Sequence, residues 1–235
     1  LKEKDRLSSI LVLPEMKMDE ESDFLIFATA DGSIRKNSLE DFKRIQANGK
    51  IAMKLAGDNS IVGVKLCTND DDVLLTTKFG KCIRFESNKL RVFKGRSSKG
   101  IKGVELAPND EIVSLSIIDS NNIKKNGKNT KNDKSELVAK QKFILSISEN
   151  GFGKKTSHYD YRTTNRGGKG IIGIINSPRN GNIASSFPVY EGDEIMISTN
   201  KGRVIRTAVK EIRSAGRNTQ GVRIIKLSGD EKVVS

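Results

Sequence analysis

The sequence predicts an all-β, propeller-like fold made of repeated units of four short strands. The chain has 235 residues, of which 21 are Gly and none is Trp, and 5% are aromatic. This composition is typical of short strands joined by glycine turns. One sequence pattern also recurs four times at a period near 50 residues, which lies in the range of propeller blades.

Each repeat opens with a hairpin in which an apolar strand, a turn glycine and a basic strand follow one another. The four hairpins span residues 24–36, 73–85, 143–155 and 195–206. Their turn glycines are Gly32, Gly80, Gly151 and Gly202, spaced 48, 71 and 51 residues apart. The middle spacing falls to 49 when residues 120–141 are left out as an insertion. Glycine suits such turns because it adopts a positive φ without steric cost.

A second glycine and two further strands complete each repeat. The second glycines are Gly49, Gly100, Gly170 and Gly221. The third strands are expected at residues 51–55, 101–106, 171–174 and 222–227, and the fourth at 61–64, 112–115, 183–186 and 233–234. Short helical turns are expected at 39–45 and 209–213.

We interpret residues 1–235 as one domain of about four blades. The blades are expected at residues 24–70, 72–119, 142–189 and 194–235. Residues 120–141, rich in Lys and Asn, are expected to form a disordered surface loop. Residues 1–14 match only the last part of a repeat, with a strand at 9–13, so we expect them to end a preceding blade.

The charge balance indicates a polyanionic partner. The chain has 42 Lys and Arg against 29 Asp and Glu, a formal net charge of +13. Binding to phosphates releases counterions and therefore rewards clustered cations. No apolar run is long enough to span a membrane, and no secretory signal is present. The two cysteines, Cys67 and Cys82, fit a reduced, cytoplasmic protein, and with one His they make no metal site.

Basic residues recur at equivalent positions after the turn glycine and around the second glycine of each repeat. A radial repeat places equivalent positions at successive points around one rim. We therefore predict a basic outer rim that contacts a phosphate backbone without reading bases. The predicted contact residues are Arg35, Lys36, Lys50, Lys81, Arg84, Lys99, Lys102, Lys154, Lys155, Arg166, Lys169, Arg203, Arg206, Arg217 and Arg223.

The repeats resemble blades of the C-terminal domain of the DNA gyrase A subunit. The resemblance is carried by the stretches FATADGSIRK (27–36), GKIAMKL (49–55), GFGKKT (151–156) and GRNTQGV (216–222). It implies a β-pinwheel, usually of six blades, in which each four-stranded blade is completed by a strand from its neighbour. It also implies a module that binds and bends duplex DNA without strong sequence preference and supports ATP-dependent negative supercoiling. The implied partners are the rest of the gyrase A subunit, together with the gyrase B subunit, in a bacterial cytoplasmic, nucleoid-associated heterotetramer.

Two alternatives stay open. The family's signature box, Gln-Arg-Arg-Gly-Gly-Lys-Gly, belongs to its first blade, and only a near-copy occurs here at residues 165–170. This leaves room for the related domain of the topoisomerase IV A subunit, whose box is degraded. The second alternative is a propeller that binds an acidic protein through its flat face or central channel. Cations on the outer perimeter would favour DNA over such a protein.

We expect no catalysis by this chain, and neither a cofactor nor a metal. The only His, His158, is expected at the surface beside Tyr159 and Tyr161. None of the three tyrosines lies in a motif like that of the family's DNA-cleaving Tyr, which belongs to a different domain. The sequence contains no GxxxxGK[ST] loop that would bind ATP phosphates.

Overall fold

A computed structural model of the chain describes residues 8–13, 23–42, 49–119 and 142–235. Within these ranges the regular elements are antiparallel strands and short 3-10 turns, which confirms the all-β prediction. No helix there is long and apolar enough to cross a membrane. The predicted insertion at 120–141 lies outside the described residues, as do residues 1–7 and 14 of the predicted preceding blade.

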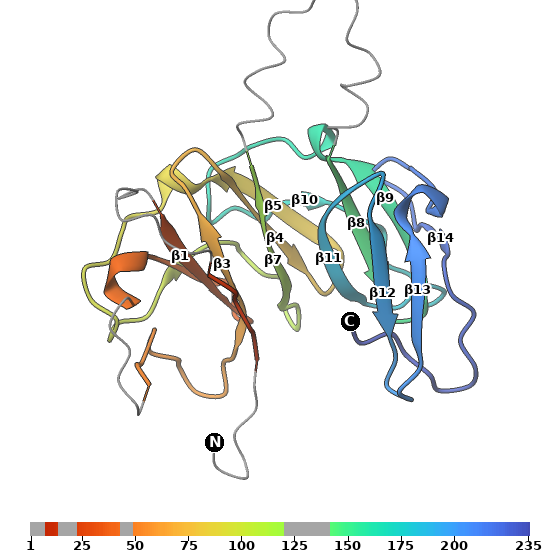
Figure 1. The fold of residues 1–235 in the computed structure, drawn as a ribbon, viewed down its shortest axis with the longest axis horizontal. Coiled ribbons are helices and arrows are strands. Elements are labelled where there is room, and N and C mark those ends of the chain that lie inside the picture. The colour runs from red at the N-terminus through yellow and green to blue at the C-terminus, as the bar shows by residue number, and fades with distance from the viewer. Residues whose placement is uncertain (1–7, 14–22, 43–48, 120–141) are drawn as a thin grey trace, which may run out of the picture.

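Three sheets have four strands each, and a fourth sheet has two (Figure 1). The first has the order β3-β1-β2-β6, the second β10-β5-β4-β7, the third β11-β8-β9-β14, and the fourth pairs β12 with β13. The strands are β1 (Phe24–Thr29), β2 (Ser33–Ser38), β3 (Ile61–Cys67), β4 (Asp72–Thr77), β5 (Lys81–Glu86), β6 (Ile101–Lys102), β7 (Ile112–Ile118), β8 (Lys142–Ser148), β9 (Phe152–Ser157), β10 (Ile171–Ile172), β11 (Ile183–Tyr190), β12 (Glu194–Ser198), β13 (Val204–Ala208) and β14 (Val222–Arg223).

Each of the first three sheets receives its outer strand from the following repeat. β6 pairs with β2, β10 with β5, and β14 with β9, always antiparallel. We call β6, β10 and β14 the donated strands. The second glycines that precede them are needed because a Cβ at Gly100, Gly170 or Gly221 would lie 2.5–2.6 Å from a carbonyl oxygen of the receiving strand. The strand exchange implied by the resemblance is therefore present.

The predicted strands at 9–13 and 51–55 are absent because they have no sheet to join, and the predicted strand at 233–234 is only an isolated bridge at Val233. Residues 9–13 and 51–55 have no regular structure, and Ile51 is 74% exposed. Residues 51–55 stand at the sequence position of a donated strand, yet no hairpin among the described residues precedes the first sheet to receive them. The donated strands are also shorter than predicted, with two residues each in regular pairing.

The fourth sheet lacks an outer strand for the same reason. β12 and β13 pair over Glu194–Ser198 and Val204–Ala208, and Val233 bridges to Thr199 on the other edge. Among the described residues, no strand pairs with the outer edge of β13. The edge of β13 is accordingly open, with Val204 exposed.

The sheets are arranged around their inner strands. β7 contacts both β3 and β11, so these three strands lie next to one another across neighbouring sheets. The donated strands occupy the opposite, outer edges of the same sheets. Figure 1 shows the sheets following one another from β1 at one end to β12 and β13 at the other. The outer edges therefore form the perimeter of the molecule.

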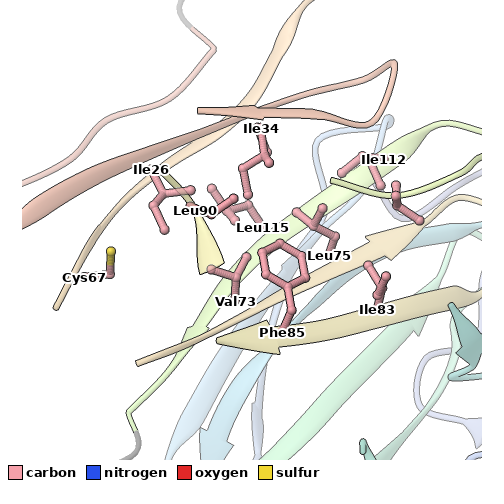
Figure 2. Packing of buried hydrophobic residues seen from close by; sticks show 12 residues of the cluster. Ile26, Ile34, Cys67, Val73, Leu75, Ile83, Phe85, Leu90, Ile112 and Leu115 are labelled. Carbon is pink, nitrogen blue, oxygen red and sulfur yellow. The ribbon is translucent and has the colours of Figure 1, made fainter. Parts of the chain in front are cut away.

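Apolar side chains between the sheets hold this arrangement together. Ile26 and Ile34 of the first sheet pack with Val73, Leu75 and Phe85 of the second in one buried cluster (Figure 2). A second cluster joins the third sheet to the fourth. Complete burial of a side chain such as Phe85 contributes roughly 1.5–3 kcal/mol. Sheets packed on both faces explain why β1 and β4 are buried along nearly their whole length.

A 3-10 turn follows the second strand of every repeat. The four turns are η1 (Leu39–Phe42), η2 (Ser87–Lys89), η4 (His158–Asp160) and η5 (Val209–Glu211). The sequence predicted the first and last of them, and the other two were missed. Their first residues are buried, and basic side chains donate to the carbonyl groups of Ser87, His158 and Val209.

The turn glycines give a test of strand donation. Gly80 and Gly202 have φ values of 83° and 78°. A Cβ at Gly80 would lie 2.3 Å from the carbonyl oxygen of Ile174, whereas a Cβ at Gly202 would meet nothing within 4 Å. We expect Gly202→Ala to cost about 1 kcal/mol from backbone strain alone. We expect Gly80→Ala to lower the free energy of unfolding by at least about 2 kcal/mol more than Gly202→Ala does, because the donated segment must move. Urea unfolding of both variants measures the difference, and equal losses would contradict this packing.

Candidate nucleic-acid interface

The basic residues of the repeats fall into a buried set and an exposed set. The buried set lies on the second strand of each hairpin, three or four residues after the turn glycine. It contains Arg35, Lys36, Arg84, Lys154 and Lys155, each with at most 6% of its surface exposed. The prediction that these five face solvent on the rim is wrong. Their side chains point into the junction with the next repeat.

Three buried cations bind the 3-10 turn of the following repeat. Lys36 Nζ donates to the carbonyl of Ser87 at 3.2 Å, and Lys155 Nζ donates to that of Val209 at 3.0 Å. Arg84 Nη1 donates to the carbonyl of His158 at 2.9 Å. Each acceptor is the first residue of its turn. Equivalent cations therefore join each sheet to the next.

Nearby acceptors satisfy the charge of these cations. Arg84 forms a buried ion pair with Asp72, with Nη2 to Oδ2 at 2.7 Å. Lys155 pairs with Glu191 at 2.7 Å. Lys36 donates to the amide oxygen of Asn69 at 2.6 Å, and burial lowers its pKa. Buried charges must be paired or hydrogen-bonded, and these are.

The other two buried cations hold the loops that precede the donated strands. Arg35 Nη1 donates to the carbonyl oxygen of Ser98 and to its Oγ at 3.0 Å. Lys154 Nζ donates to the carbonyls of Gly216 at 2.5 Å and Arg217 at 2.6 Å. Burial lowers the pKa of Lys154 to about 8. These bonds fix loops 96–100 and 216–221 from their inner side.

The exposed set lies largely on and around these loops. Arg166, Lys169 and Lys99 are exposed, as are Lys102 and Arg223 on the donated strands. The structure places the predicted residues Lys50, Lys81 and Arg217 at half-buried positions. Lys50 Nζ donates to the carbonyl of Asp41 at 3.2 Å.

The exposed loops form a continuous row along the perimeter. We call loops 96–100, 166–170 and 216–221 the loop row. Their residues Ser98, Gly168 and Thr219 accept backbone hydrogen bonds from the segment of the previous repeat that follows its second glycine. The N–H groups that donate these bonds belong to Lys54, Glu105 and Ile175, at distances of 2.9–3.3 Å. Loop and donated segment thus alternate around the outer edges of the sheets.

An arginine secures each loop of the row. Arg96, Arg166 and Arg217 each donate from Nη1 to a carbonyl of the previous segment, at 3.2, 3.0 and 2.7 Å. Each stands four residues before its second glycine. Arg96 was missed from the sequence although this spacing would have identified it. The arginines therefore have both a structural contact and a position on the perimeter.

Little negative charge opposes the row. Within the described residues, Lys99, Arg166, Lys169 and Arg223 form no ion pair, while Lys102 lies 3.6 Å from Glu105. Small cavities of about 200 and 140 Å³ lie behind the second and third loops. Cationic residues Arg162 and Lys169 line the first, and Lys154 and Arg213 line the second.

The fourth repeat differs from the others at its two predicted cations. Arg206 is equivalent to the buried Lys155, yet its side chain is 72% exposed and pairs with Glu194. No turn of a following repeat is present among the described residues to accept from it. Arg203 is exposed and its charge is neutralised by the buried Glu231 at 2.7 Å. Neither residue belongs to the loop row.

The remaining titratable groups show no catalytic arrangement among the described residues. No group of three or more His, Cys, Asp and Glu residues there could hold a metal. His158 is buried, not exposed as predicted, because its ring Nδ1 lies 2.7 Å from the carbonyl of Lys142. Burial raises the thiol pKa of Cys67 and Cys82 to about 12, which disfavours the reactive thiolate. Tyr161 is also buried.

Comparison with known proteins identifies similar sequences. A profile of the family "DNA gyrase C-terminal domain, beta-propeller" matches residues 23–68, 71–119, 142–189 and 193–235. The DNA gyrase A subunit of Rickettsia prowazekii is 38% identical over 263 residues, covering 100% of this chain and 29% of that protein. The DNA gyrase A subunit of Staphylococcus aureus (strain MRSA252) is 36% identical, covering 99% and 24%. The chain therefore spans less than a third of the length of these relatives.

Two solved structures share the fold. A DNA gyrase A C-terminal domain has a TM-score of 0.75 at 22% identity, covering 92% of this chain and 65% of that one. The C-terminal domain of a DNA topoisomerase IV has a TM-score of 0.79 at 21% identity, covering 95% and 63%. The fold is thus common to both, whereas the relatives at 36–38% sequence identity are gyrase proteins.

The buried and exposed cations are expected to respond differently to substitution. Arg84→Met leaves the carboxylate of Asp72 buried without its partner, so we expect a loss of about 3–5 kcal/mol in the free energy of unfolding. Lys169→Met, on the loop row, is expected to change it by less than about 0.5 kcal/mol. Urea unfolding measures both. An Arg84→Met chain as stable as the parent would contradict the joining role.

Lys154 predicts a pH dependence of stability. Its pKa falls from 10.5 in the unfolded chain to about 8 in the folded one. Between these values the unfolded state binds more protons, so the contribution of Lys154 to stability increases as pH rises from about 8 to 10.5. As pH rises across this range, the free energy of unfolding of the parent chain should increase relative to that of the Lys154→Met variant. A difference between the two chains that stays constant with pH would contradict the buried, charged lysine.

Proposed function

The chain belongs to the DNA gyrase C-terminal domain family, and we propose that it binds and bends duplex DNA along the loop row of its outer perimeter. In this proposal the chain is a non-catalytic module. It supports ATP-dependent negative supercoiling by an enzyme that also contains the rest of the gyrase A subunit, together with the gyrase B subunit. Its setting is the bacterial cytoplasm, in association with the nucleoid.

The observation that carries the proposal is the position of the exposed cations. Lys99, Lys102, Arg166 and Lys169 lie on consecutive loops and donated strands at the outer edges of neighbouring sheets. A curved row of cations suits a phosphate backbone that passes from blade to blade. Contacts to phosphates position DNA without carrying sequence information, so binding by this row should tolerate any sequence.

The row also favours duplex over single-stranded DNA. Proteins that bind single strands stack the bases on aromatic side chains. Among the described residues, the exposed aromatic side chains are Phe79 and Tyr159, and neither lies on the loop row. The row therefore supplies charge without stacking platforms.

Bending the duplex around the perimeter has a free-energy cost. Turning 20–30 base pairs by 40–90° costs on the order of 1–6 kcal/mol. Charge neutralisation can offset this cost at low salt, because each phosphate contact releases counterions. Arg35 and Lys154 hold loops 96–100 and 216–221 in place, and Arg166 holds loop 166–170, so little ordering of the loops remains when DNA binds.

An acidic protein partner is the second candidate. Propeller scaffolds commonly bind proteins on a flat face or at the central channel. The exposed cations of the loop row lie instead at the outer edges of the sheets, away from the inner strands β3, β7 and β11. This position favours DNA.

Removal of charge from the loop row and from the donated strand β6 tests the proposal. The triple variant Lys99→Gln, Lys102→Gln and Lys169→Gln should lower the slope of log K against log salt by about 2.7, at roughly 0.9 for each lost phosphate contact. The matched control replaces Lys65, Lys89 and Lys201, which are exposed outside the row. Fluorescence anisotropy of a labelled duplex at several salt concentrations gives both slopes. Equal slopes for the two variants would count against the row.

A further inference from the structure

A cavity of about 440 Å³ lies at the turn end of the third sheet, outside the loop row. It is bordered by the hairpin turn at Asn150, the donated strand β14 and the segment that follows β14. Its lining includes four cationic residues, Arg179, Arg223, Lys226 and Lys232. We call this cavity the basic cleft. Only Arg223 was among the predicted contact residues.

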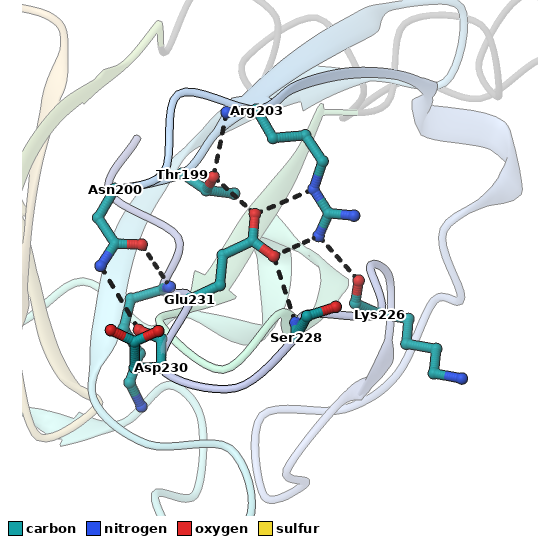
Figure 3. Close-up of polar contacts among 8 residues, drawn as sticks. Thr199, Asn200, Arg203, Lys226, Ser228, Asp230 and Glu231 are labelled. Atoms are coloured by element: carbon teal, nitrogen blue, oxygen red, sulfur yellow. Dashed lines mark hydrogen bonds and ion pairs between the residues drawn. The ribbon is translucent and has the colours of Figure 1, made fainter.

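Among the described residues, no acidic side chain pairs with the cations of the basic cleft. In the part of the chain that the structure describes, none of the four cations forms an ion pair. One carboxylate, Glu231, lines the cleft, but Arg203 binds both of its oxygens (Figure 3). The Thr199 hydroxyl and the Ser228 N–H also donate to Glu231, and the hydroxyl bond contributes most to its lowered pKa. Glu231 is therefore occupied by these donors.

The cationic side chains are held in position by neighbouring residues. The guanidinium groups of Arg179 and Arg223 lie over the ring of Phe152, at 4.7 and 5.3 Å from its centroid. Phe152 is buried and forms a fixed support for both. Lys232 Nζ donates to the amide oxygen of Asn150. Such preorganisation reduces the entropy lost when an anion binds.

The cleft beside the third sheet differs in charge from the equivalent place beside the first sheet. By alignment of the second and fourth repeats, Lys226 corresponds to Glu105 and Lys232 to Glu111. In the second repeat these glutamates pair with Lys102 and Lys78, at 3.6 and 3.0 Å. The equivalent place beside the first sheet is therefore neutralised, whereas the third sheet carries uncompensated positive charge.

We propose that the basic cleft is a phosphate-binding site that holds the backbone of duplex DNA, and that it adds a contact at the third sheet which the first sheet lacks. This rests on the proposed function, because the duplex is the source of the phosphate. Arg223 belongs both to a donated strand and to the cleft, so a backbone that follows the row reaches the cleft at this residue. The number of phosphate contacts then differs from one blade to another.

Two titrations test the cleft. Calorimetry with inorganic pyrophosphate at low salt probes the phosphate site directly, and anisotropy of a labelled duplex probes DNA. The cleft variant is Arg179→Gln with Lys226→Gln, both exposed positions. Its matched control is Lys65→Gln with Lys89→Gln. A second cleft variant, Lys226→Glu with Lys232→Glu, gives the fourth repeat the charges of the second. Circular dichroism melting verifies that each variant folds.

We expect pyrophosphate to saturate the parent chain and the control, and both cleft variants to bind it at least about tenfold more weakly. The Gln cleft variant should lower the salt slope for duplex DNA by about 1.8, corresponding to two lost phosphate contacts, and the control should not. Absence of pyrophosphate binding by the parent overturns the inference. Loss of pyrophosphate binding with an unchanged DNA slope overturns the duplex as ligand and assigns the cleft to a free phosphate compound. A parent chain that binds pyrophosphate but no DNA refutes the proposed function itself.

Discussion

The structure depends on the donation of one short strand from each repeat to the sheet before it. Two residues in regular pairing are enough to complete each sheet. The second glycine lets the two backbones approach closely, and the turn glycine leaves room for the residues that follow the donated strand. A Cβ at Gly221 would lie 2.6 Å from the carbonyl oxygen of Gly153. Donation determines which edge of a sheet is outermost and brings the preceding loop to that edge. The binding surface that we propose is thus a consequence of how the sheets are completed.

Positive charge has two separate uses in this fold. Inside the junctions, Lys36, Arg84 and Lys155 bind carbonyl groups of the next 3-10 turn. Burying a cation has a large desolvation cost, which is tolerable only where hydrogen bonds and an opposite charge compensate it. On the perimeter, Lys99 and Lys169 remain hydrated and unpaired among the described residues, and can exchange counterions for phosphates. The first use joins each sheet to the next, and the second places free positive charge on the perimeter.

The repeat pattern was sufficient to predict the fold, since turn glycines and apolar strands are local signals that four copies reinforce. It was insufficient to separate the two kinds of cation. Arg84 and Lys169 are both basic residues at recurring positions of the repeat, so the sequence does not distinguish them. The pairing of β5 with β10 and the position of η4 are what bury Arg84. Residues 51–55 have the pattern of a strand but no partner, and a strand requires one. The basic cleft was missed because Arg179, Lys226 and Lys232 come from segments that only the tertiary structure brings together.

The central claim is that a rigid, curved row of cations bends the duplex as it binds. Ligase-catalysed cyclisation of a DNA fragment of about 150 base pairs, one persistence length, measures bending directly. At saturating protein, the account predicts a faster rate of monomeric circle formation with the parent chain than with naked DNA. The variant with Lys99, Lys102 and Lys169 replaced by Gln, compared at equal saturation, should lose most of this acceleration. Saturated binding by the parent chain with no increase in cyclisation rate would contradict the account.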